Sequence, residues 1–163
     1  MKHLLETGAL GQGWPSQLPL PGKVSTLIQH RLELLSPRAL GLAQVAAVAG
    51  SRFSLRLASR MLRQPLAELG EAARELEAAQ LLVDERFSHD LIHETLEATM
   101  PPPMKAMLHG LVAAVLEEDG ASPLLLAHHW LRGCEPGRAL PQLLRTASGD
   151  DEALLPGGAA AEL

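Results

Sequence analysis

Apolar residues recur along most of this chain at the spacing of a helix with one buried face. Between residues 24 and 35 they return every three to four positions, with polar side chains between them. Ser36-Pro37 follows, and serine is a favoured N-cap while proline suits the first helical turn. The next stretch, 37–49, is small and apolar on most faces and ends before Gly50, which predicts a buried second helix.

The pattern then predicts two more helices, a short hairpin and a further run of helices. Ser54 caps a helix over 55–62, and Pro65 opens one that reaches about Leu82. The predicted inward stripe of that longer helix consists of Leu66, Leu69, Ala72, Ala73, Leu76 and Ala79. Residues 81–83 and 86–88 form two strands around Asp84-Glu85, although this turn lacks the Gly or Asn of a favoured hairpin. The remaining helices are expected near 89–99, 103–118, 122–133 and 136–147.

This order of elements predicts a mainly all-α fold. Three helices followed by a minimal two-stranded wing are typical of a winged-helix domain, here with antiparallel TPR-like helices after it. The expected parts are an N-terminal helix with a Pro/Gly connector (1–23), the winged-helix domain (24–100), the TPR-like segment (101–147) and a disordered tail (148–163).

The composition agrees with a folded helical chain and indicates in which compartment of the cell the protein is found. The sequence is 47% hydrophobic but has only two Phe, two Trp and no Tyr, so the core must be built from aliphatic side chains, as in helix-on-helix packing. A single cysteine, Cys134, cannot form an internal disulfide, and we interpret it as a loop thiol without chemistry. No apolar stretch approaches the roughly 18 residues needed to cross a bilayer. The sequence therefore predicts no membrane contact and a cytoplasmic protein.

Charge argues against DNA as a partner. The net charge is −5, and residues 65–80, the would-be recognition helix, carry four glutamates against the single cation Arg74. Arg56, Arg60 and Arg63 do form a basic stripe at i, i+4 and i+7. We interpret this stripe as a solvated face that pairs with acidic neighbours. A stand-alone winged-helix DNA-binding regulator that uses this face is the alternative function.

Two histidines at helical spacing raise the question of a metal. His89 and His93 are placed like the histidines of the zinc-protease H-E-x-x-H motif, with Asp90 in the glutamate position. No third ligand stands at the expected downstream position, and His109, Glu117 or His128 could complete a site only if the fold brought one close. A metal-binding helical protein is the second alternative, and the sequence predicts no metal.

No other residue group predicts catalysis. We expect one histidine of His128-His129 to help Trp130 lock the last helices together. The chain has no phosphate-binding loop, because no Lys-Ser/Thr follows the early glycines, and it has no nucleophile elbow or paired carboxylates. The sequence therefore predicts no catalytic residues and a protein that is not an enzyme.

Residues 18–53 resemble the segment that follows the ATPase core in signal-transduction NTPases of the STAND class. These include bacterial LuxR-like and SARP-like regulators and ATPases fused to adenylate cyclases. The matching family pattern is R-L-x-x-L-S-P followed by A-A-V-x-G-x-x-F, and the residues that carry it are Arg31, Leu32, Leu35, Ser36, Pro37, Ala46, Ala47, Val48, Gly50 and Phe53. Residues 81–92 and 127–130 continue the resemblance into the wing and the TPR-like array.

The resemblance implies a regulatory function that depends on a separate ATPase domain. In this class the winged-helix domain holds the ADP-bound state, and a histidine of a Met-His-Asp motif faces the ADP phosphate. His89 and Asp90 match that motif, with Ser88 in the hydrophobic position. The P-loop core would precede Met1, so we expect a fragment or separate module that binds no cofactor alone and meets ADP or ATP only through an ATPase domain in cis or in trans. Other proteins would bind its helical surface.

Overall fold

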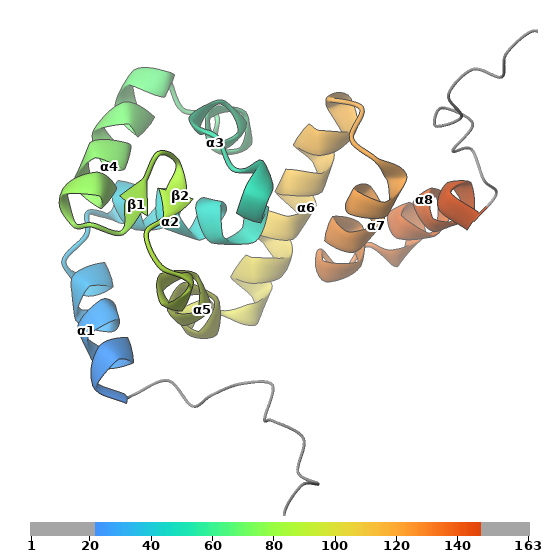
Figure 1. The fold of residues 1–163 in the computed structure, drawn as a ribbon. Coiled ribbons are helices and arrows are strands. Elements are labelled where there is room, and N and C mark those ends of the chain that lie inside the picture. The colour runs from blue at the N-terminus through green and yellow to red at the C-terminus, as the bar shows by residue number, and fades with distance from the viewer. Residues whose placement is uncertain (1–21, 148–163) are drawn as a thin grey trace, which may run out of the picture.

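The computed structural model describes residues 22–147, and this part of the chain is mainly helical with one small antiparallel hairpin (Figure 1). Its elements are α1 (Gly22–Glu33), α2 (Pro37–Ala49), the 3-10 turn η1 (Gly50–Arg52), α3 (Leu55–Leu62), α4 (Leu66–Ala78), β1 (Leu82–Val83), β2 (Arg86–Phe87), α5 (Asp90–Thr99), α6 (Pro102–Glu118), α7 (Pro123–Arg132) and α8 (Pro136–Ala147). The predicted N-terminal connector, apart from its last two residues, and the predicted tail lie outside the described residues.

Helix α2 lies at the centre of the larger group of helices and packs against α3, α4, α5 and α6 (Figure 1). Leu42 and Val45 on this helix are completely buried, as its apolar sequence predicts. At its N-cap, the Ser36 hydroxyl accepts from the Ala39 N–H at 3.2 Å. Glu75 of α4 accepts from the Ser36 hydroxyl and the Ser36 N–H, both at 2.6 Å, and these bonds lower the pKa of the Glu75 carboxyl. The same serine therefore caps α2 and anchors α4.

Helix α4 is shorter than the sequence predicts. It ends at Ala78 rather than near Leu82, because Gln80 adopts a left-handed conformation with φ 57° and the Leu81 N–H bonds back to the Leu76 carbonyl at 2.9 Å. Leu82 is thereby released into β1. Most of the predicted stripe is buried or partly buried, but Leu66 was wrongly assigned to it: the side chain is 51% exposed because it lies in the first turn, at the free end of the helix.

The predicted hairpin is confirmed, with strands of two residues each. Leu82 pairs with Phe87 and Val83 with Arg86. Asp84 and Glu85 both have positive φ, 49° and 60°, which is the geometry that Asn-Gly turns adopt at lower cost. One Glu85 carboxylate oxygen accepts from the Leu55 N–H at 3.0 Å, so the turn is held against the first residue of α3.

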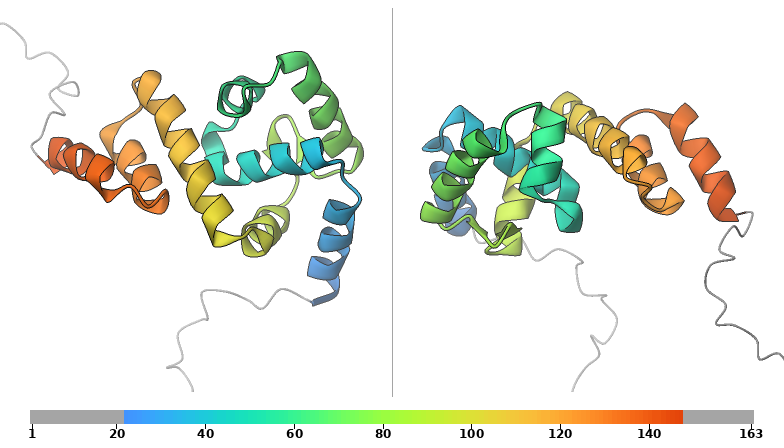
Figure 2. Two further views of the ribbon diagram at one scale, coloured as in Figure 1. Left: turned by 180° about the vertical axis from the view of Figure 1, so that it is seen from behind. Right: turned by 90° about the horizontal axis from the view of Figure 1, so that it is seen from above.

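Helices α6, α7 and α8 follow one another in a row that extends away from the other helices (Figures 1 and 2). Helix α6 packs against α2 and α3 on one side and against α7 on the other, and α7 packs against α8. Glu117 of α6 binds Arg138 of α8 at 2.5 Å, and the Arg138 guanidinium lies 3.6 Å from the centre of the buried Trp130 ring. The predicted locking function of Trp130 is confirmed.

The ends of α6 and α7 share one backbone geometry but use different residues. In each, the residue after the cap has positive φ and the next N–H bonds back into the last turn; this residue is Gly120 after α6 (φ 68°) and Cys134 after α7 (φ 61°). A left-handed backbone conformation costs cysteine free energy, whereas glycine adopts it without that cost.

We therefore expect Cys134→Gly to raise the free energy of unfolding by about 1 kcal/mol. Gly120→Ala, the matched change in the opposite direction, should lower it by a similar amount. Thermal unfolding of both variants beside the unmodified protein measures the effect. A Cys134→Gly variant less stable than the unmodified protein would show that the exposed thiol contributes more than its backbone conformation costs.

Candidate functional site

His89, the residue predicted to sense a nucleotide phosphate, lies immediately before α5. It is the N-cap residue, with extended backbone (φ −149°), yet its side chain makes no capping hydrogen bond and is exposed. The preceding residue fixes this position, because the Ser88 N–H bonds to the Leu81 carbonyl at 3.1 Å and the Ser88 hydroxyl to the Gln80 carbonyl at 2.7 Å. The backbone next to His89 is therefore held in place, while the imidazole is exposed and does not cap the helix.

The His89 side chain lines an open groove of about 410 Å³ between α1, the hairpin and α5. We call this the α1–α5 groove; its lining consists of Leu27, Ile28, Arg31, Gln80, Leu81, Val83, Ser88, His89, Leu91 and Ile92. Most of these side chains are apolar, and Arg31 of α1 supplies a guanidinium on the same groove as the imidazole. No function in a site was predicted for Arg31, because 57 residues separate it from His89 and such a separation gives no local signal.

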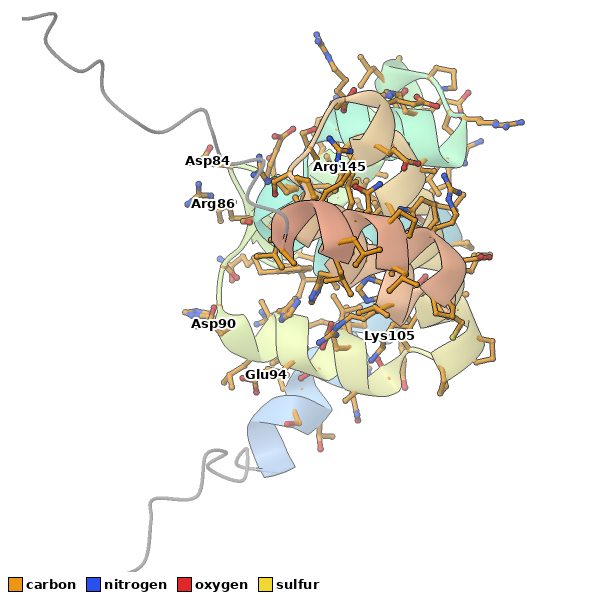
Figure 3. All side chains as sticks on the ribbon, turned by 90° about the vertical axis from the view of Figure 1, so that its right-hand side faces the viewer. Asp84, Arg86, Asp90, Glu94, Lys105 and Arg145 are labelled. Carbon is orange, nitrogen blue, oxygen red and sulfur yellow. The ribbon has the colours of Figure 1, made fainter. Side chains whose placement is uncertain are left out.

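Asp90 was predicted together with His89, but the two side chains line different hollows. Asp90 is exposed in the first turn of α5 and lines a second hollow of about 560 Å³, beside the hairpin turn. Figure 3 shows Asp90 along the same edge of the molecule as Asp84 and Arg86, which also line this second hollow. Neighbouring residues at a helix start point in different directions, so Asp90 favours the start of α5 rather than sharing the His89 groove.

His93 faces the interior instead of joining His89. Its Nε2 donates to the Ala47 carbonyl of α2 at 3.0 Å, and its ring lies 5.9 Å from the Phe87 ring. A nitrogen that donates to a carbonyl has no lone pair free for a metal. Within residues 22–147 no group of three or more His, Cys, Asp or Glu side chains could hold a metal ion. The structure thus gives His93 a packing function.

The three arginines of the basic stripe on α3 differ in whether they form ion pairs. Arg60 binds Asp119 at 2.5 Å and Glu118 at 2.6 Å at the end of α6, which raises the pKa of its guanidinium. The predicted pairing with acidic neighbours is confirmed for Arg60. Arg56 and Arg63 are exposed, as a solvated face predicts, but neither has an ion pair with another described residue, so the predicted pairing is wrong for these two. With Arg60 neutralised, the stripe lacks its middle charge for a nucleic-acid backbone.

A buried histidine pair that was not predicted from the sequence lies between α6 and α7. His109 and His129 are each 3% exposed, and their Nδ1 atoms lie 2.9 Å apart, so one ring must donate and the other accept. Burial, followed by the nearby cations, lowers the pKa of both to about 4. His128, the neighbouring residue, is exposed and lies edge-on to both rings. Both histidines stood in the sequence as candidates, but nothing local signalled that they pair.

No known protein family, curated protein or solved structure matches this chain. Among residues 22–147, no helix is both long and apolar enough to cross a bilayer. The function must therefore be inferred from the hollows of the structure and the charges around them.

Proposed function

We propose that this chain is a non-enzymatic, cytoplasmic regulatory module of a STAND-type signal-transduction ATPase. In this proposal a winged-helix arm (residues 24–100) and TPR-like helices (101–147) act by protein–protein contact. The element order supports it, since helices α2, α3 and α4 are followed by a hairpin and then by further helices. The exposed face of α6, α7 and α8 offers surface to other protein partners.

The observation that carries the proposal is the α1–α5 groove, where His89 and Arg31 lie beside an apolar lining. An imidazole that makes no capping bond can donate to a phosphate oxygen, and a guanidinium adds a fixed positive charge. His89 stands at the N-terminal end of α5, where a helix carries a positive partial charge. The apolar residues would bury surface of the ATPase domain, and the two polar side chains would contact the phosphate of the ADP that it holds.

The proposal is tested by the nucleotide dependence of ATPase binding. The whole chain is titrated by calorimetry into a STAND-type ATPase domain from the same genome, loaded either with ADP or with a non-hydrolysable ATP analogue. We expect the ADP form to bind about tenfold more tightly, a normal coupling between two ligands. His89→Ala should remove most of that preference. His128→Ala, which changes an exposed histidine on α7, should leave it unchanged.

Three results would contradict the proposal. Equal affinity for both nucleotide states would contradict a sensing function. Binding of ADP by this chain alone that is lost in His89→Ala would show that no ATPase partner is needed. A shift of duplex DNA at physiological salt, with a steep dependence on salt concentration, would favour a DNA-binding regulator instead.

A further inference from the structure

A third hollow lies between the start of α3 and the turn that joins α6 to α7, two segments that can be followed in Figure 1. Its volume is about 440 Å³, and we call it the arginine pocket. Its lining consists of Arg52, Ser54, Arg56, Leu57, Arg60, Leu116, Asp119, Gly120, Ala121 and Ser122. None of these residues lines the α1–α5 groove, so the two hollows are separate sites.

The charges in the arginine pocket are not balanced. Three arginines line it, against one carboxylate, Asp119. That carboxylate is already engaged by Arg60, which also binds Glu118. Arg52 and Arg56 are exposed, and neither forms an ion pair with another residue of the described chain. The pocket thus presents two uncompensated guanidinium groups next to a third that is locked in place.

The arginine pair is built on a fixed backbone. Arg52 ends η1 and Arg56 lies in the first turn of α3, four residues later. The start of α3 is itself satisfied, since the Ser54 hydroxyl accepts from the Leu57 N–H at 3.1 Å and Glu85 accepts from the Leu55 N–H. Arg60 ties α3 to the end of α6 and so fixes the opposite wall. The arginine side chains, rather than the helix end, supply the positive charge of the pocket.

On the α7 side, the pocket offers a hydroxyl donor. Ser122 is the N-cap residue of α7, but its side chain makes no capping bond. A carboxylate has two oxygens and fully satisfies one guanidinium fork, whereas a phosphate monoester has three terminal oxygens and up to two negative charges. Two guanidinium groups and a hydroxyl around one hollow therefore match a phosphate group better than a carboxylate.

We propose that the arginine pocket binds a phosphate monoester, with Arg52 and Arg56 on its oxygens and the Ser122 hydroxyl as a further donor. The apolar residues Leu57, Leu116 and Ala121 would contact the group esterified to the phosphate. The site is independent of the nucleotide-sensing function proposed for His89, and either proposal can fail without the other.

The test is a titration of the whole chain, followed by the amide shifts of the pocket in two-dimensional NMR. Inorganic phosphate, O-phosphoserine and AMP are titrated separately, so that the tightest of the three identifies the source of the phosphate group. We expect saturable binding with a dissociation constant on the order of 1 mM for the best ligand. Arg52→Gln and Arg56→Gln should each weaken it about tenfold, because each removes a charge-assisted hydrogen bond.

The matched control is Arg63→Gln, which removes an exposed arginine that does not line the pocket. It should leave the affinity within about twofold, and His89→Ala should do the same. Both pocket arginines are exposed and unpaired in the described chain, so the folded state should survive their replacement. Absence of saturation with all three ligands overturns the proposal, as does an equal loss in Arg63→Gln, which would indicate general attraction. Displacement of phosphate by random duplex DNA with a steep salt dependence would assign the surface to nucleic acid instead.

Discussion

Lowering the pH from about 7.5 to about 5 should reduce the free energy of unfolding by about 4 kcal/mol, because His109 and His129 are buried as a neutral pair. Their pKa values in the folded chain are about 4, against 6.5 for an unperturbed histidine. Between these values the unfolded chain takes up protons that the folded chain excludes. Stability therefore falls as the pH drops from 6.5 towards 4 and levels off below it, and at pH 5 each histidine costs about 2 kcal/mol.

The charged groups that face the pair contribute to these low pKa values. His128 and Arg132 lower the pKa of both histidines, and Lys105 also lowers that of His109. In addition, the Nε2 of His109 is buried without a hydrogen-bond partner in the described chain. Two protonated rings could not share the Nδ1–Nδ1 bond, so full protonation would break this hydrogen bond between α6 and α7. The carboxylate anchor at Glu75, whose pKa is lowered, weakens only at pH values below its ordinary 4.5, outside this window.

Urea unfolding at the two pH values measures the prediction. His109→Leu/His129→Leu should make stability nearly independent of pH between about 7.5 and 5, because it removes both titrating groups. His129→Gln keeps a polar partner for His109 and should remove about half of the stability that is lost between the two pH values. His128→Gln, in the exposed neighbour, should retain most of it. An unmodified chain with the same stability at both pH values would contradict the buried neutral pair.

Local signals explain which parts of the fold the sequence predicts correctly. Helices α2 and α3 begin where Ser36 and Ser54 stand as N-caps, and each cap forms its expected hydrogen bond. The end of α4 was misplaced because Gln80, rather than a glycine, adopts the left-handed conformation that stops the helix. The hairpin turn was recognised from its flanking strands, although Asp84-Glu85 is an unfavourable sequence for it.

The candidate site is formed by residues that lie far apart in the sequence. Such residues have no fixed spacing that a sequence motif could reveal. His89 was identified, but its neighbour in the groove, Arg31, comes from α1. The basic stripe on α3 was predicted as one surface of three arginines. In the fold, Arg60 forms ion pairs with the end of α6, and Arg52, which lies outside the stripe, lines the same pocket as Arg56 and Arg60. Periodicity identifies which face of a helix a residue occupies, and tertiary packing decides which charges that face meets.

Two glycines lie at the contact between α6 and α7, and replacing them with alanine should change the free energy of unfolding in opposite directions. A Cβ on Gly133 would lie 3.0 Å from the Gly110 nitrogen and 3.2 Å from both the Gly110 Cα and the His129 carbonyl oxygen. The two Gly110 atoms are backbone of α6, so contact with them can be relieved only if the end of α7 moves away from α6, whereas the His129 oxygen belongs to α7 itself. Gly133→Ala should lower the free energy of unfolding by about 1–3 kcal/mol.

Gly110→Ala, on the other side of the same contact, should have the opposite effect. A Cβ on Gly110 would have no heavy atom within 4 Å, apart from neighbouring residues of its own helix, and the residue lies inside α6. Alanine there restricts the unfolded chain and favours the helix, which should raise the free energy of unfolding by about 1 kcal/mol. Urea unfolding of the two variants at neutral pH compares them directly, and Gly133→Ala as stable as Gly110→Ala would contradict the close approach. Gly133→Ala strains the same helix contact that holds His109 against His129. It should therefore also raise the pH at which the chain unfolds in acid.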